Sequence, residues 1–249
     1  MVDIEYLRLE DGSSLAYRHT PGHTPGILFC AGFNSNMQGT KALALEHWCQ
    51  QQGVQYTRFD YQGHGESSGK LADGCIGRWR DDTLAILDRV TSGPQLIVGS
   101  SMGGWIMLLV ALLRPERLIG LLGLAAAPDF TERLRHRLTP AQQHQLAANG
   151  YADLPNCYDD GEPYRISQHL LDEGSAHLLL QKEIPIDLPV SLIQGQLDED
   201  VPWQLALTLA EKISSDEVSI QILKKGDHRL SEPADLQCLR ATAAQLLAR

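Results

Sequence analysis

The segment Gly99-Ser100-Ser101-Met102-Gly103 constrains the fold of this chain more than any other feature. It follows the apolar run 95–98, which has the β-branched content of a buried strand, and it precedes the apolar run 105–113, which has the length of a helix. Ser101 is therefore predicted to lie on a tight strand-to-helix turn that the flanking glycines permit, with its hydroxyl clear of the sheet. The N–H groups of the following helix would face any negative charge that develops beside Ser101.

Strands and helices alternate along most of the chain. An antiparallel hairpin is expected at 4–9 and 14–19, because both runs alternate polar and apolar residues around a turn. The later strands are expected at 27–30, 54–59, 95–98, 118–124, 190–194 and 218–223, and the helices at 41–52, 79–90, 105–113, 233–247 and a segment ending near 212. This order predicts an α/β fold whose sheet is mostly parallel, with helices on both faces.

Residues 129–186 differ in composition from the rest of the chain, because they are polar and rich in Gln, His, Asp and Tyr. Short helices are expected at 140–149 and 166–173, and no strand is expected in this segment. A plain connection of this length is rare, so the segment is predicted to be a small helical cap over the active site. At 249 residues the chain fits one α/β core, residues 1–128 and 187–249, with the cap 129–186 inserted in it.

The composition excludes several classes of partner. A formal net charge of −10 argues against nucleic acid, since phosphate binding needs a basic surface. No apolar run approaches the length of a membrane span, so stable membrane insertion is not expected.

Residues 1–9 lack the basic and apolar stretches of a signal peptide and the Arg/Ser-rich character of a transit peptide, and they predict a cytoplasmic location.

Neither a metal nor a cofactor is expected. The five cysteines (Cys30, Cys49, Cys75, Cys157 and Cys238) are odd in number and widely spaced, which predicts reduced, mostly buried thiols. The Gly-rich stretches match neither a P-loop nor a dinucleotide-binding fingerprint. His64 stands between two glycines, but no second ligand lies nearby in the sequence, so it is interpreted as a loop residue.

Three residues have the types and the order of a nucleophilic relay. A serine hydroxyl needs an imidazole to accept its proton, and the imidazole needs a carboxylate to fix its tautomer. Ser101, Asp198 and His228 each follow a predicted strand, in the chain order of α/β-hydrolases. Asp200 is an alternative acid, although its place just before Pro202 suits helix capping.

An acyl-transfer intermediate also needs two N–H donors directed at its oxyanion. In this fold the residue after the nucleophile, Met102, supplies one of them. The loop after the strand 27–30 supplies the other, and Phe33 is the candidate.

These residues resemble a known superfamily. The segments 99–104, 60–67, 195–202 and 227–228 are similar to those of the serine α/β-hydrolases. The segments 39–44, 58–61, 77–80, 104–105, 201–203 and 227–229 more narrowly resemble its palmitoyl-protein thioesterases of mitochondrial type, also described as acyl-glucuronide esterases. The resemblance covers about residue 25 to the C-terminus. It implies an α/β-hydrolase fold and hydrolysis of thioesters or esters by Ser101, Asp198 and His228.

The leading hypothesis is a serine hydrolase that forms an acyl-Ser101 intermediate. Its substrate would be a small acyl ester or thioester, or an acylated protein. One alternative is a generic carboxylesterase that acts on small esters or acyl glucuronides, because the catalytic residues do not select the leaving group. Another is a non-catalytic binding module on the same fold, which would be expected to have lost one of the three residues.

Overall fold

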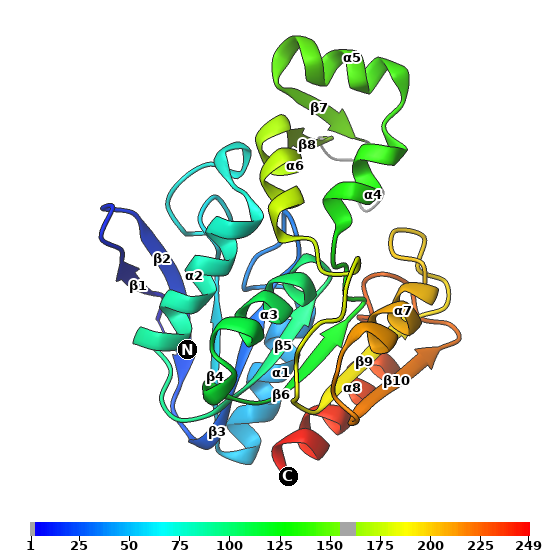
Figure 1. The fold of residues 1–249 in the computed structure, drawn as a ribbon. Coiled ribbons are helices and arrows are strands. Elements are labelled where there is room, and N and C mark those ends of the chain that lie inside the picture. The colour runs from blue at the N-terminus through cyan, green and yellow to red at the C-terminus, as the bar shows by residue number, and fades with distance from the viewer. Residues whose placement is uncertain (1–2, 155–162) are drawn as a thin grey trace.

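A computed structural model describes residues 3–154 and 163–249 of the chain. Its centre is an eight-stranded sheet in the order β1-β2-β4-β3-β5-β6-β9-β10 (Figure 1). The strands are β1 (Glu5–Arg8), β2 (Ser14–Thr20), β3 (His23–Cys30), β4 (Val54–Phe59), β5 (Gln95–Ser100), β6 (Leu118–Leu124), β9 (Val190–Gly195) and β10 (Val218–Leu223). The β1–β2 and β2–β4 pairs are antiparallel and the others are parallel, which confirms the predicted mostly parallel sheet with an N-terminal hairpin.

Helices cover both faces of this sheet. Those of the core are α1 (Thr40–Gln52), α2 (Ile76–Arg89), α3 (Met102–Leu113), α7 (Gln204–Lys212) and α8 (Pro233–Leu247), with short 3-10 turns at Leu71–Asp73 and Pro115–Arg117. α1 contacts α8 on one face, and α2 contacts α3 on the other (Figure 1). α3 is apolar all around and its first ten residues are buried, as expected of a helix enclosed by the fold.

The strand β5 occupies the middle of the sheet. Val98 pairs with Phe29 of β3 on one side and with Leu122 of β6 on the other. Because β3, β5, β6, β9 and β10 are parallel, their carboxyl ends meet at one edge. Ser101, Asp198 and His228 all follow strands at this edge, where open α/β sheets place their functional sites.

An insertion between β6 and β9 protrudes from that edge and reaches farthest from the sheet at α5 and β7 (Figure 1). It contains α4 (Phe130–Arg137), α5 (Pro140–Asn149), β7 (Tyr151–Leu154), β8 (Tyr164–Ser167), α6 (Gln168–Gly174) and a 3-10 turn at Ser175–His177. The prediction that this segment contains no strand is wrong, since β7 pairs antiparallel with β8. Strands of four residues are too short to display a convincing alternating pattern. Residues 155–162 of the predicted cap lie outside the described residues.

Side chains attach the insertion to the core. The indole nitrogen of Trp105 in α3 donates to the carbonyl of His177 at 3.1 Å. The carboxylate of Glu173 accepts from the backbone N–H of Gly77 at 3.1 Å and bonds the His177 ring at 2.6 Å. These bonds connect α6 and the turn after it to α2 and α3, so the insertion is held to the core beside the helix that follows Ser101.

The cysteines are free thiols where the structure describes them. Cys30, Cys49 and Cys75 are buried, and Cys238 is partly buried. Cys157 lies outside the described residues. Burial raises the pKa of Cys30 and of Cys49 to about 12, so these thiols stay protonated at neutral pH and are poor nucleophiles.

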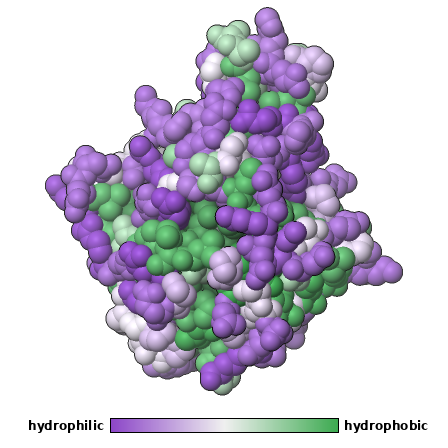
Figure 2. All heavy atoms as spheres, viewed as in Figure 1, coloured by the Kyte–Doolittle hydropathy of each residue, from purple (hydrophilic) through white to green (hydrophobic). Residues whose placement is uncertain are grey.

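Hydrophilic residues cover most of the insertion on the face that Figure 2 shows. Apolar residues gather lower on that face, in the region of α2 and α3. Within the described residues, no helix combines the length and the apolar character needed to cross a membrane.

Candidate active site

Ser101 lies in a strained backbone conformation between β5 and α3. Its φ of 54° and ψ of −118° fall in a region that non-glycine residues rarely adopt, and such strain is typical of functional turns. As predicted, the flanking glycines permit a tight turn at Ser101, and neither Gly99 nor Gly103 has a positive φ itself. A Cβ on Gly103 would collide with the carbonyl oxygens of Cys30 and Ala31. These glycines therefore permit close backbone packing around the turn, and Ser101 itself carries the strain.

The structure brings the three predicted residues into one hydrogen-bonded relay. The Nε2 atom of His228 lies 3.0 Å from the Oγ atom of Ser101. Its Nδ1 atom lies 2.8 Å from the Oδ2 atom of Asp198. These are the distances at which an imidazole can accept a hydroxyl proton while a carboxylate holds its other nitrogen.

The carboxylate of Asp198 is fully buried and its oxygens are satisfied by donors. Oδ1 accepts the backbone N–H groups of Asp200 at 3.0 Å and Val201 at 2.8 Å. Oδ2 accepts the side-chain amide of Gln194 at 2.8 Å in addition to His228. This set of donors holds the carboxylate in the orientation in which it bonds His228.

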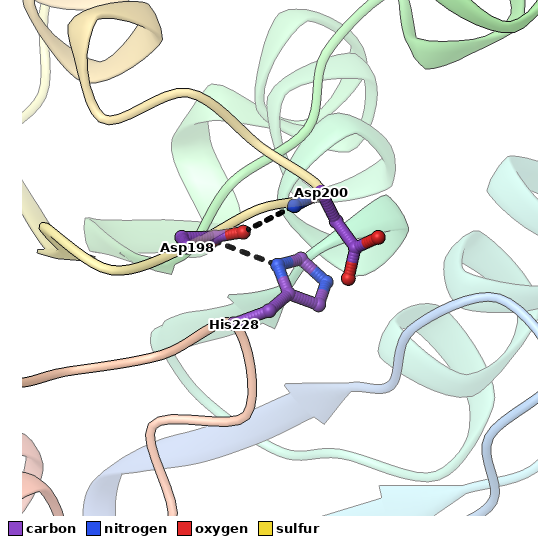
Figure 3. Close-up of side chains that lie close together, drawn as sticks. All are labelled: Asp198, Asp200 and His228. Carbon is purple, nitrogen blue, oxygen red and sulfur yellow. Dashed lines mark hydrogen bonds and ion pairs between the residues drawn. The ribbon is translucent and has the colours of Figure 1, made fainter. Parts of the chain in front are cut away.

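The predicted capping role of Asp200 is wrong. α7 has Trp203 as its N-cap residue, with no side-chain capping bond. Pro202 and Trp203 separate Asp200 from the helix, so its side chain is too early in the chain to cap it. Figure 3 shows instead that the imidazole of His228 lies between the carboxylates of Asp198 and Asp200. Asp200 is thus a half-buried acidic neighbour of the relay.

Asp198, Asp200 and His228 also have the side-chain types of a metal site, and their potential ligand atoms lie within 4.8 Å of one another. However, both ring nitrogens of His228 already have partners in Ser101 and Asp198. The relay therefore uses the two His228 nitrogens that a metal ion at this cluster would need.

The two candidate oxyanion donors lie beside Ser101. Met102 is the first residue of α3, whose N-terminal N–H groups face the site. A Cβ on Gly32 would lie 3.4 Å from the Cβ of Ser101, so the loop that carries Phe33 passes directly alongside it. Phe33, Ser101 and Met102 line one cavity. This placement suits the predicted roles of Phe33 and Met102.

Two cavities meet at Ser101. The first, of about 170 Å³, lies under the insertion and is lined mainly by apolar side chains, among them Phe130, Leu134, Leu154, Ile166 and Val201. The arginines Arg133 and Arg137 and the acid Asp200 also line it.

The second cavity, of about 330 Å³, is more polar than the first and is bounded by the loop 31–36, the start of α1 and the loop after His228. Lys41 in its wall donates from Nζ to the carbonyl of Arg229. Burial lowers the pKa of Lys41 to about 8, although the carboxylate of Asp227 opposes this shift. Ser101 thus separates an apolar space from a polar one.

His64, predicted only as a loop residue, supports the loop that carries Phe33. Its Nε2 atom accepts the backbone N–H of Asn34 at 3.2 Å, which joins it to the loop of Phe33. The ring also stacks edge-on against Trp79 at 5.2 Å and Phe33 at 6.3 Å. Burial lowers the pKa of His64 to about 4, so the ring stays neutral and its Nε2 stays an acceptor at neutral pH. No local pattern connects His64 with Asn34, because the two are thirty residues apart.

We expect His64→Ala to lower kcat by roughly tenfold, less than the 10²–10³ lost with a whole oxyanion donor, because the donor loop loses only its support. His64→Gln should recover part of the loss, since an amide oxygen can accept the Asn34 N–H. The measurement is kcat on one ester, with His19→Ala in β2 as the control. An unchanged kcat in a folded His64→Ala variant would contradict this role.

The chain is similar in sequence and in structure to known hydrolases. A family model described as serine aminopeptidase, S33, matches residues 23–152. The mitochondrial palmitoyl-protein thioesterase ABHD10 of Mus musculus is 42% identical over 98% of this chain and 82% of its own. The structure of mouse alpha/beta hydrolase domain-containing protein 10 superposes with a TM-score of 0.92 at 42% identity, covering 99% of this chain and 98% of that one. A putative hydrolase from Agrobacterium vitis is 34% identical, with a TM-score of 0.94 and 99% of each chain covered.

These comparisons confirm the resemblance and the fold that the motifs predicted, and they contradict the predicted location. The curated palmitoyl-protein thioesterases that match 98% of the chain are named mitochondrial, which points to mitochondria rather than the cytoplasm. The prediction of a cytoplasmic location is therefore wrong. It depended on residues 1–9 alone.

Proposed function

The chain belongs to the serine aminopeptidase S33 family of α/β-hydrolases and is an ester-hydrolysing enzyme, and from this we propose that Ser101, His228 and Asp198 cleave acyl thioesters and esters. The observation that carries the assignment is the continuous relay from Ser101 Oγ through His228 to Asp198, with hydrogen bonds of 3.0 and 2.8 Å. The relay begins at the strained turn where both cavities meet.

In the first half-reaction, Ser101 Oγ attacks the substrate carbonyl carbon while His228 Nε2 takes the hydroxyl proton. The carbonyl oxygen becomes an oxyanion, which accepts the backbone N–H groups of Met102 and Phe33. As the tetrahedral intermediate collapses, the bond to the leaving sulfur or oxygen breaks, and the proton on His228 passes to that atom. Asp198 stabilises the imidazolium throughout. The product is an acyl ester on Ser101.

In the second half-reaction, water replaces the leaving group. His228 Nε2 takes a proton from this water as its oxygen attacks the acyl carbon. The second tetrahedral intermediate then collapses with release of the carboxylic acid, and the proton returns to Ser101 Oγ. The same oxyanion donors serve both steps.

The two cavities suggest how the substrate lies. The acyl chain fits the apolar cavity under the insertion, and the leaving group fits the polar cavity beside Lys41. The relatives are named palmitoyl-protein thioesterases, and an acylated protein is accordingly one proposed substrate class. We propose that residues 129–186 act as the cap over this acyl cavity, inserted in a core formed by 1–128 and 187–249.

We expect kcat/KM to rise with acyl length and then fall. A buried methylene contributes about 0.8 kcal/mol when its burial is realised in the transition state. The apolar cavity of about 170 Å³ is close to the roughly 150 Å³ that encloses one benzene ring, so the rise should end at medium length. Thioesters should react faster than matched alkyl esters, because a thiolate leaves more readily than an alkoxide.

The test is a C2 to C16 series of thioesters and alkyl esters at equal concentration. A flat profile, or a consistent preference for alkyl esters, would favour a generic carboxylesterase of small esters. Hydrolysis of none of them would favour the non-catalytic binding module.

A further inference from the structure

Arg133 is a charged residue in the apolar cavity that the proposed mechanism does not use. It projects from α4 and lines the cavity together with Ser101. Its Nη1 atom is buried and has no hydrogen-bond partner. Arg135 on the same helix forms ion pairs with Glu132 and Asp172, whereas Arg133 forms none within the described part of the chain. Buried polar groups in native proteins nearly always have partners, so an unpaired guanidinium nitrogen beside a binding cavity points to a missing ligand.

The charges around this cavity favour an anion. Arg133 and the exposed Arg137 both line it, and Asp200 is the one acidic side chain among the described lining residues. The carboxylate of Asp198 is already occupied by His228, Gln194 and two backbone N–H groups. Burial and the neighbouring Arg137 lower the pKa of Arg133, while the carboxylates of Asp198, Asp129 and Asp200 oppose that shift. An arginine stays protonated in proteins even so, which leaves the described lining of the cavity with one excess positive charge.

We propose that the acyl cavity accepts an acyl group that ends in a carboxylate, with Arg133 binding that carboxylate. This inference rests on the proposed function, since it concerns the acyl group transferred to Ser101. The apolar walls suit the methylenes between the two ends of such a chain. A planar guanidinium suits the far end, because it can bind a carboxylate through two parallel N–H bonds.

The probes are two thioesters of N-acetylcysteamine that share an uncharged leaving thiol and six acyl carbons. One carries the hexanoyl group and the other the adipoyl group, which has a carboxylate in place of the terminal methyl. We expect the wild-type enzyme to hydrolyse the adipoyl thioester with a kcat/KM at least equal to that of the hexanoyl thioester. An apolar cavity without a cation would strongly favour hexanoyl, because a carboxylate loses its hydration there.

The decisive variant is Arg133→Met, which keeps much of the side-chain length and removes the charge. We expect it to lower kcat/KM for the adipoyl thioester by about 10- to 100-fold more than for the hexanoyl thioester, as for loss of a charge-assisted hydrogen bond. Arg135→Met is the matched control on the same helix, and it should change neither value. Thermal unfolding of both variants checks that the insertion stays folded.

A third thioester shows whether Arg133 binds a carboxylate on the acyl group or one on the leaving group. Hexanoyl 3-mercaptopropionate places the carboxylate on the leaving group, and Arg133→Met should not affect its hydrolysis selectively. A selective effect would overturn the inference by assigning Arg133 to the leaving-group side. Equal effects of Arg133→Met on the adipoyl and hexanoyl thioesters would overturn it as well. If the wild-type enzyme hydrolyses none of the three, the proposed function itself fails, and this outcome is distinct from hydrolysis without discrimination.

Discussion

Replacing Ser101 with alanine is expected to lower kcat by a factor on the order of 10⁴ to 10⁶ on any good substrate, as in other serine hydrolases that lose their nucleophile. The reason is that the acyl-enzyme cannot form without Oγ, and His228 then has no hydroxyl to activate. Stability should change little, because alanine and serine meet the same strain at a φ of 54° and the Oγ atom is not packed in the core.

The check on Ser101→Ala combines steady-state rates with a thermal unfolding curve. Ser100→Ala is the matched control, since Ser100 is the adjacent serine but belongs to β5 and lies outside the relay. We expect this control to keep most of its activity. Substantial turnover by a folded Ser101→Ala variant would exclude Ser101 as the nucleophile.

The second large loss of kcat is expected when Asp198, the acid of the relay, is replaced. Asp198→Asn should lower kcat by roughly 10⁴, because an amide that donates to His228 Nδ1 imposes the wrong tautomer and leaves the imidazolium unsupported. The new amide would also face the donor Nε2 of Gln194, which now bonds Oδ2. Asp200→Asn should have a far smaller effect, since Asp200 contributes its backbone N–H to Asp198 and this group survives the substitution.

Parallel kcat measurements on the two Asn variants decide between these acids. A comparison of circular dichroism spectra ensures that both variants are folded. Should Asp200→Asn prove the more damaging, the two residues would exchange roles, and the Asp198 bond to His228 would be structural only.

Much of this fold could be predicted from local patterns. The strands 118–124 and 218–223 and the helix 233–247 have the predicted bounds, since each is a periodic or apolar run bordered by clear breakers. The insertion was harder to predict, because β7 and β8 have four residues each and pair mainly with one another.

The candidate site was likewise only partly predictable from the sequence. Ser101, Asp198 and His228 could be proposed from the sequence because each follows a strand of one parallel sheet, and topology then brings them together. The choice between Asp198 and Asp200 needed coordinates, since both follow β9 within five residues. The contact of His64 with the Asn34 loop and the position of Arg133 in the acyl cavity depend on tertiary packing that no local pattern encodes.

The central claim is that Ser101 is the residue that becomes acylated. Labelling the intact protein with a fluorophosphonate and mapping the modified peptide by mass spectrometry tests this claim most directly. We expect one adduct per chain on Ser101, which disappears in Ser101→Ala and forms much more slowly in His228→Ala. Labelling of another residue, or undiminished labelling of Ser101→Ala, would contradict the proposed nucleophile.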